Sequence, residues 1–244
     1  MYDLHMHILP GLDDGAEDME EAVEMAETAV FGGTAVCAAT SHGKLSKFSL
    51  RDLEQYLAAY RKKLEEFRRE LTRRQIPLQV VSGMELLADS RLLEYAESHV
   101  LPGYGTTRTI LVEFHFDISF RRAADTLDEL QRKKYRVILA HPERYDFIRQ
   151  EYQRARTLFR DGVILQVNSG SMEGRFGRSV FHAADYILGE GLAGLVASDA
   201  HDSVLRTADL EETARILDLS YGNGAAEVLL EENPARILSG RHII

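Results

Sequence analysis

The chain has 244 residues, of which 45% are hydrophobic, so it is long enough to bury a large core as one domain of α/β barrel size. Its formal net charge of −10 argues against a nucleic-acid-binding surface, which needs clustered Lys and Arg. Cys37 is the only cysteine, which excludes an intrachain disulfide and is typical of a reducing compartment such as the cytoplasm.

Nothing in the sequence indicates export or membrane insertion. No apolar run approaches the roughly 20 residues that a membrane span requires. A cleaved signal peptide is not expected, because the segment from Asp3 to His7 begins beside Met1 and cleavage would remove it. We therefore expect a soluble, cytoplasmic protein.

Predicted strands and helices alternate along the whole chain. Strand composition occurs at residues 2–7, 34–41, 78–85, 109–114, 136–141, 164–168 and 192–198. Amphipathic patterns predict helices at residues 18–31, 50–74, 120–134, 146–160, 179–190, 208–217 and 225–231, and glycines at 32, 33, 162, 189 and 191 supply stop signals. These βα repeats without a Pro- or Ser-rich linker favour one barrel-like α/β domain over residues 1–244.

One predicted helix is strongly basic. Between Arg51 and Arg74, Lys and Arg alternate with Glu65, Glu66 and Glu70. A solvated helix face is the favoured interpretation, and docking of an acidic partner or a membrane surface is the alternative.

Residues of metal-ligand type stand where the predicted strands end. They are His5, His7, His42, Glu85, Glu113, His141, Asp199 and His201. Alternate side chains of a strand share a face, so His5 and His7 can reach one point. A single His or Glu at a strand end is more often a solvated residue, but the whole set together indicates a metal cluster. The carboxyl ends of barrel strands carry the active site, and Asn168 also falls there.

Six short motifs carry a family resemblance. They are His-Met-His-Ile-Leu-Pro-Gly-Leu-Asp-Asp-Gly at 5–15, Ala-Thr-Ser-His at 39–42, Leu-Val-Glu-Phe at 111–114, Ala-His-Pro-Glu-Arg at 140–144, Gln-Val-Asn-Ser-Gly-Ser at 166–171 and Val-Ala-Ser-Asp-Ala-His at 196–201. In order and spacing they resemble the polymerase and histidinol phosphatase (PHP) superfamily. Within it they look most like the manganese-dependent protein-tyrosine phosphatases of bacterial capsule and exopolysaccharide loci, the CpsB/YwqE type.

The resemblance implies a fold and a site. The fold is a distorted (β/α)7, TIM-like barrel with up to three divalent metals, Mn²⁺ first, with Fe, Zn or Co also suited to such ligands. The implied ligands are His5, His7, His42, Glu85, Glu113, His141, Asp199 and His201. Arg144 and Arg206 match phosphate-binding arginines, and His201 or a metal-bound water would protonate the leaving oxygen. Asp14 either joins this site or is a turn or helix-cap residue.

The implied reaction is hydrolysis of phosphotyrosine by a metal-bound hydroxide. The implied substrate is the Tyr-rich tail of a bacterial tyrosine kinase that controls polysaccharide assembly. Histidinol phosphate or another small phosphomonoester is the first alternative, and a catalytically silent kinase-docking module is the second. The chain departs from many relatives at Gly43 and Met6, which bears on the shape of the site's rim.

Other chemistries lack their residues. A cysteine phosphatase needs Cys-x5-Arg, but the sixth position after Cys37 is Gly43, so we expect Cys37 in a core strand. No phosphate loop or dinucleotide fingerprint occurs. The segment from Ser169 to Ser171 lacks a nucleophile elbow, which favours a hydrogen-bonding loop.

Overall fold

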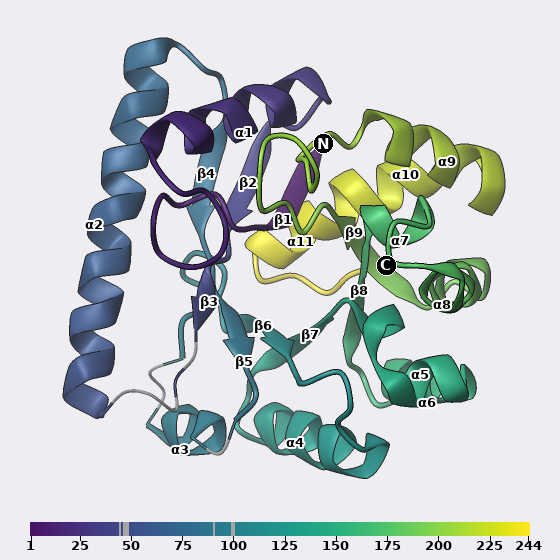
Figure 1. Ribbon diagram of the computed structural model, residues 1–244. Coiled ribbons are helices and arrows are strands. Elements are labelled where there is room, and N and C mark those ends of the chain that lie inside the picture. Colours follow the sequence, from purple (N-terminus) through teal and green to yellow (C-terminus); the bar gives the residue numbers. More distant parts are fainter. Residues whose placement is uncertain (44, 46–48, 90, 99–100) are drawn as a thin grey trace.

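The computed structural model describes residues 1–43, 45, 49–89, 91–98 and 101–244. Strands form the centre of the molecule and helices surround them (Figure 1). The strands are β1 (Tyr2–Met6), β2 (Val36–Ala39), β3 (His42–Gly43), β4 (Gln79–Ser82), β5 (Glu85–Leu87), β6 (Thr109–Glu113), β7 (Arg136–Ala140), β8 (Ile164–Asn168) and β9 (Ala193–Ala197). All of their pairings are parallel.

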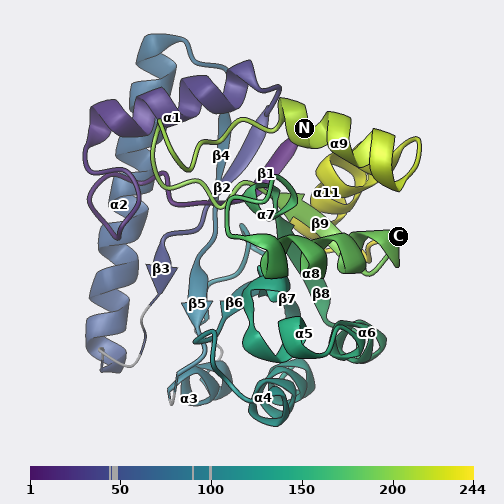
Figure 2. The ribbon, with the colours of Figure 1, turned by 45° about the vertical axis from the view of Figure 1, so that its right-hand side comes forward.

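The strands form a ring made of two sheets. One sheet has the order β1-β2-β4 and the other β3-β5-β6-β7-β8-β9. The last strand returns to the first, since the Asp199 N–H donates to the His5 carbonyl and the His7 N–H to the Ala200 carbonyl, both at 2.9 Å. Figures 1 and 2 both show β1 between β2 and β9. The predicted distorted barrel is therefore confirmed, with β2 and β3, and likewise β4 and β5, as two halves of one pass.

The two interrupted passes correct the prediction of unbroken strands at 34–41 and 78–85. The first pass breaks at Thr40, whose Oγ1 accepts the Met6 N–H at 2.9 Å. The Thr40 N–H donates to the Met6 carbonyl at 2.8 Å. The first halves, β2 and β4, therefore stay in the sheet of β1, and the second halves, β3 and β5, join the sheet of β6.

Helices cover the outside of the strands. They are α1 (Met19–Phe31), α2 (Leu50–Arg74), α3 (Leu92–Glu97), α4 (Phe120–Arg132), α5 (Asp146–Gln150), α6 (Gln153–Arg160), α7 (Ser169–Met172), α8 (Arg178–Gly189), α9 (Glu211–Tyr221), α10 (Ala225–Glu227) and α11 (Asn233–Leu238). The described residues also include a 3-10 turn, η2 (Pro142–Arg144), and a π turn, η3 (Val228–Glu232). Gly33, Gly162 and Gly191 have positive φ after α1, α6 and α8, which confirms the predicted stops.

Three helix predictions need correction. The helix predicted at 146–160 is two helices, because Glu151 has extended backbone with φ −150° and ψ 91°. The one predicted at 208–217 begins at Glu211, whose N–H donates to the Asp209 carboxylate, and runs to Tyr221. The one predicted at 225–231 continues through η3 into α11. The sequence did not predict α3, α7 or η2.

The burial of Cys37, Met6 and Gly43 tests what the sequence predicted for each of them. Cys37 is fully buried in β2, as predicted. Met6 is also fully buried, and a Cβ on Gly43 would lie 2.7 Å from the Met84 sulfur. Met6 and Gly43 therefore belong to the packing around the strands and not to the rim of the site, contrary to expectation.

The basic helix α2 has the solvated face that was predicted. Lys62 pairs with Glu66 at 3.8 Å and Arg73 with Glu70 at 2.5 Å, and both cationic side chains are mostly exposed. Exposed pairs of this kind contribute little to stability, because water screens them. In the part of the chain that the structure describes, no helix is both long and apolar enough to cross a membrane.

Candidate metal centre

The eight predicted ligand residues come together at the carboxyl ends of the strands. His5 lies in β1, His42 in β3, Glu85 in β5 and Glu113 at the end of β6. The others lie just beyond strand ends: His7 and His141 directly follow β1 and β7, and Asp199 and His201 lie in the loop after β9. These residues form three groups, and the ligand atoms inside each group lie within 4.8 Å of one another. One of the groups also includes Asp14.

The first group consists of His5, His7 and Asp199, all buried. The Nε2 atoms of His5 and His7 are 3.2 Å apart, and the Asp199 Oδ1 lies 3.4 and 3.6 Å from them. Two imidazole nitrogens that face each other beside a carboxylate need a proton or a cation between them. This donor set fits a divalent cation that prefers N and O ligands.

The second group surrounds Glu85. The His42 Nδ1 lies 3.0 Å from both Glu85 Oε2 and Glu113 Oε1. The other Glu85 oxygen, Oε1, lies 2.9 Å from the His141 Nε2 and 3.3 Å from the His5 Nε2. Glu85 thus links the first group to the second.

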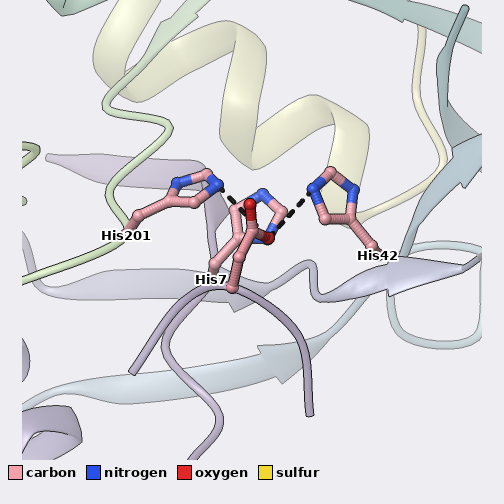
Figure 3. A group of neighbouring side chains, drawn as sticks. His7, His42 and His201 are labelled. Carbon is pink, nitrogen blue, oxygen red and sulfur yellow. Dashed lines mark ion pairs between the residues drawn. The ribbon is translucent and has the colours of Figure 1, made fainter. Parts of the chain in front are cut away.

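The third group contains the buried His7 and His201, the partly buried His42 and the exposed Asp14. Figure 3 shows the three histidine rings turned toward one another. The Asp14 Oδ1 lies 3.2 Å from the His42 Nε2 and 3.8 Å from the His201 Nε2. The Asp14 side chain is 68% exposed. Of the two sequence-based interpretations of Asp14, the geometry favours the one in which it joins the site.

Asp13 fixes the orientation of His7. Its Oδ2 accepts the His7 Nδ1 at 2.7 Å and the His42 backbone N–H at 2.7 Å, and its Oδ1 accepts the Gly15 N–H at 3.1 Å. With the His7 Nδ1 donating to Asp13, the His7 Nε2 is left free to bind a cation. The loop packs so closely that a Cβ on Gly15 would lie 1.9 Å from the His7 carbonyl oxygen.

Gln166 has the corresponding role at His5. The Gln166 Oε1 lies 2.8 Å from the His5 Nδ1, and its Nε2 donates to the Asn168 Oδ1 at 2.8 Å. Sequence reasoning quoted Asp13 and Gln166 within motifs but gave them no role. The general rule that a ligating His donates its second N–H to an acceptor is the signal that could have found them.

Both predicted arginines meet the cluster at Asp199. The Asp199 Oδ2 accepts the Arg206 Nη2 at 2.6 Å and the Asn168 Nδ2 at 2.6 Å, and the Arg144 Nη1 lies 3.5 Å away. One oxygen of Asp199 therefore faces the histidines while the other faces the guanidinium groups. An anion bound beside the cations would have two arginine donors next to it.

Backbone strain is concentrated at two of these residues. His141 has φ 35° and Asp199 has φ 53°, in the left-handed region that non-glycine residues seldom adopt. The His141 carbonyl accepts the Arg144 N–H at 2.9 Å, so this turn also sets the start of η2. Strain of this kind is common where side-chain placement matters for function.

The electrostatics of the cluster call for added positive charge. Burial alone would lower the pKa of His7, but hydrogen bonds to Asp13 and Glu85 outweigh it and raise the pKa to about 9. Burial also opposes protonation of His42, whose pKa is nevertheless raised to about 11 by Glu113 and Glu85. Burial and the charge of His7 lower the pKa of His201 to about 4. The carboxylates thus keep His7 and His42 protonated. Bound divalent cations would take the place of these protons and neutralise the carboxylates.

Glu143 anchors the segment that carries Asn168 and Ser171. Its Oε1 accepts the Asn168 N–H at 2.9 Å and the Ser171 hydroxyl at 2.7 Å, and burial raises its pKa. Ser171 therefore has the predicted hydrogen-bonding role, but it lies in the short helix α7 and not in a loop.

Fold and site together define a class of protein. A parallel (β/α) barrel with histidines and carboxylates clustered at the strand ends has the donor set of a metal-dependent barrel protein, and here two arginines lie beside that set. The sequence pattern of the family described as capsular polysaccharide synthesis, CpsB/CapC, matches residues 1–239. The chain belongs to this family.

Individual relatives are similar over their full length. The tyrosine-protein phosphatase YwqE of Bacillus subtilis is 32% identical, with 100% of this chain and 93% of the relative covered. The tyrosine-protein phosphatase CpsB of Streptococcus agalactiae is 27% identical, with 100% of both covered. A chain from the crystal structures of B. subtilis YwqE and Streptococcus pneumoniae CpsB, described as metal-dependent tyrosine phosphatases, matches with a TM-score of 0.90, 31% identity, and coverage of 100% of this chain and 96% of that one.

Proposed function

We propose that this chain is a metal-dependent protein-tyrosine phosphatase. The observation that carries the proposal is the meeting of the cation-binding groups and the two arginines at the two oxygens of Asp199. Similarity to YwqE and CpsB over the whole chain supports the same activity. We further propose that residues 1–244 act as one PHP-type domain.

The eight clustered residues and Asp14 would hold up to three divalent ions, Mn²⁺ first, with Fe, Zn or Co as alternatives. When bound, these ions would activate water and neutralise charge on the phosphoryl group. Asp13 and Gln166 hold the rings of His7 and His5 with Nε2 turned inward. Arg144 and Arg206 would bind the phosphoryl oxygens.

His201 is better suited to ligation than to protonating the leaving oxygen. Its Nδ1 lies 3.0 Å from the Asp199 carbonyl oxygen, so Nδ1 carries the proton and Nε2 is an acceptor. Its lowered pKa of about 4 also leaves little imidazolium near neutral pH. Of the two proton donors considered from the sequence, water is therefore the one we propose.

The proposed substrate is phosphotyrosine in the Tyr-rich tail of a bacterial tyrosine kinase that controls capsular or exopolysaccharide synthesis. The description of the family and the names of the relatives support this assignment. Such a kinase tail would meet the enzyme in the cytoplasm.

The test is phosphate release from a phosphotyrosyl peptide by chelator-stripped protein, before and after Mn²⁺ is added back, with histidinol phosphate in parallel. We expect activity on the peptide only with metal. Much faster hydrolysis of histidinol phosphate would move the protein to the small-molecule alternative.

A matched pair of histidine variants separates an enzyme from a silent docking module. His7→Ala should abolish turnover, because His7 belongs to two of the three groups of ligand atoms. His182→Ala, at an exposed position of α8, should keep wild-type turnover. Equal activity of the two variants would overturn the assignment of the site.

A further inference from the structure

The guanidinium of Arg144 lies between two aromatic rings. Its Cζ is 4.5 Å from the ring centre of Phe116 and 4.7 Å from that of Phe176. Phe116 follows β6, Arg144 ends η2, and Phe176 lies between α7 and α8. Three separate segments of the chain thus meet to form this stack.

Each ring is held by contacts of its own. The Phe116 carbonyl accepts the Asp146 N–H at 2.9 Å, and its ring meets His141 edge-on, with 5.8 Å between centres and 73° between planes. The Phe176 ring lies over Gly170, where a Cβ would be 3.2 Å from the Phe176 Cε2. The two rings therefore form a slot around the Arg144 guanidinium, and each ring also contacts another part of the chain.

Arg144 needs such support more than Arg206 does. The Arg206 Nη2 is 2.6 Å from Asp199, and the Asp202 carboxylate accepts the backbone N–H of Arg206 at 3.2 Å. The Arg144 Nη1 is 3.5 Å from Asp199, at the outer limit of a hydrogen bond. Stacking fixes the plane of a guanidinium through its faces and leaves the N–H groups at its edge free to donate.

We propose that Phe116 and Phe176 are positioning residues that hold Arg144 with its N–H edge toward the phosphoryl group. The inference rests on the proposed phosphatase function. It predicts that loss of either ring weakens oxyanion binding through Arg144 and not through contact with the tyrosine ring.

The experiment uses the full-length, Mn²⁺-loaded protein with Phe116→Leu, Phe176→Leu and the control Phe159→Leu. Phe159 lies on α6 and is 41% exposed, against 39% for Phe116. The readouts are KM and kcat for a phosphotyrosyl peptide, the inhibition constant of inorganic phosphate, bound metal and the melting temperature. Each slot variant should weaken phosphate inhibition about two- to fivefold, the usual strength of an exposed cation–π contact, while the control should not.

Repeating the two substitutions in an Arg144→Ala background decides the route of the effect. If the rings act through Arg144, neither substitution should weaken phosphate inhibition further in that background. Equal losses in both backgrounds would overturn the proposal, as would a raised KM for the peptide with unchanged phosphate inhibition. A wild-type protein that neither cleaves the peptide nor binds phosphate would instead refute the proposed function on which the inference rests.

Discussion

Replacement of Asp13 by Asn tests whether the carboxylate behind His7 sets the affinity of the centre for metal. The Oδ2 of Asp13 accepts two donors, from the His7 ring and the His42 backbone, and its Oδ1 accepts the Gly15 N–H. An amide can accept on one side only, so its NH₂ group must face at least one of these N–H donors. His7 would then face a neutral oxygen or a donor, and either change lowers the basicity of its Nε2. Loss of such an outer partner costs about 10- to 100-fold in metal affinity, which is about 1.4–2.7 kcal/mol.

The assay is calorimetric titration of Mn²⁺ into chelator-stripped wild type, Asp13→Asn and Asp18→Asn. Asp18 lies in the same loop and caps α1, where it accepts the N–H groups of Glu20 and Glu21 at 2.9 and 3.1 Å. Asn caps helices as well as Asp does, and both variants remove one negative charge. We therefore expect weak binding in Asp13→Asn alone. Wild-type affinity in a correctly folded Asp13→Asn protein would refute the role assigned to Asp13.

Two further predictions concern protons and the thiol. The pKa values of His7 and His42 are raised to about 9 and 11, so Mn²⁺ must displace protons from both rings when it binds. The affinity for Mn²⁺ should therefore rise with pH up to about pH 9, by about tenfold per pH unit for each proton displaced. A flat dependence of the dissociation constant on pH in that range would contradict these assignments. Cys37→Ala should keep wild-type turnover, and thiol-alkylating reagents should have no effect, because Cys37 is fully buried and burial raises its pKa. Loss of turnover in a folded Cys37→Ala protein would instead point to cysteine chemistry.

The eight clustered residues were predictable because parallel strands of a barrel bring their carboxyl ends together. Once Glu113 and Asp199 are recognised as following buried strands, the fold itself makes them neighbours in space. The structure bears out this convergence down to 3.0 Å between the His42 Nδ1 and the Glu113 Oε1.

The residues behind the ligands could not be predicted in the same way, because loop conformation decides them. Asp13 and Asp14 are adjacent acids that sequence alone cannot distinguish. In the structure Asp13 accepts a hydrogen bond from the His7 Nδ1, and Asp14 lies beside the His42 Nε2. Phe116 and Phe176 are 60 positions apart in separate loops, and only the folded chain reveals that they share Arg144.

Strand periodicity explains some of the ligand directions. The barrel interior contains Ala38 of β2 and Leu111 of β6. Continued alternation from these residues turns His42 and Glu113 inward, at even spacings along the same passes. The interruption between β2 and β3 does not alter this, since Ala39 pairs with Ser82 before the break and His42 pairs with Glu85 after it, at the same offset.

Other ligands reach the site only because the backbone departs from regular alternation. Leu4 packs in the barrel interior, so an unbroken β1 would turn Met6 inward and His5 outward. The register of β1 against β2 shifts between Asp3 and Met6, the stretch that contains His5. As a result His5 and His7 face the site, while Met6 packs in the surrounding core. At the end of β7, the left-handed backbone of His141 likewise turns its side chain toward the site, directly after the inward-facing Ala140. An irregular register and a strained residue thus turn ligands inward directly after interior residues. Period-two patterning alone would not place these ligands, which were predicted from their positions at strand ends and from their motifs.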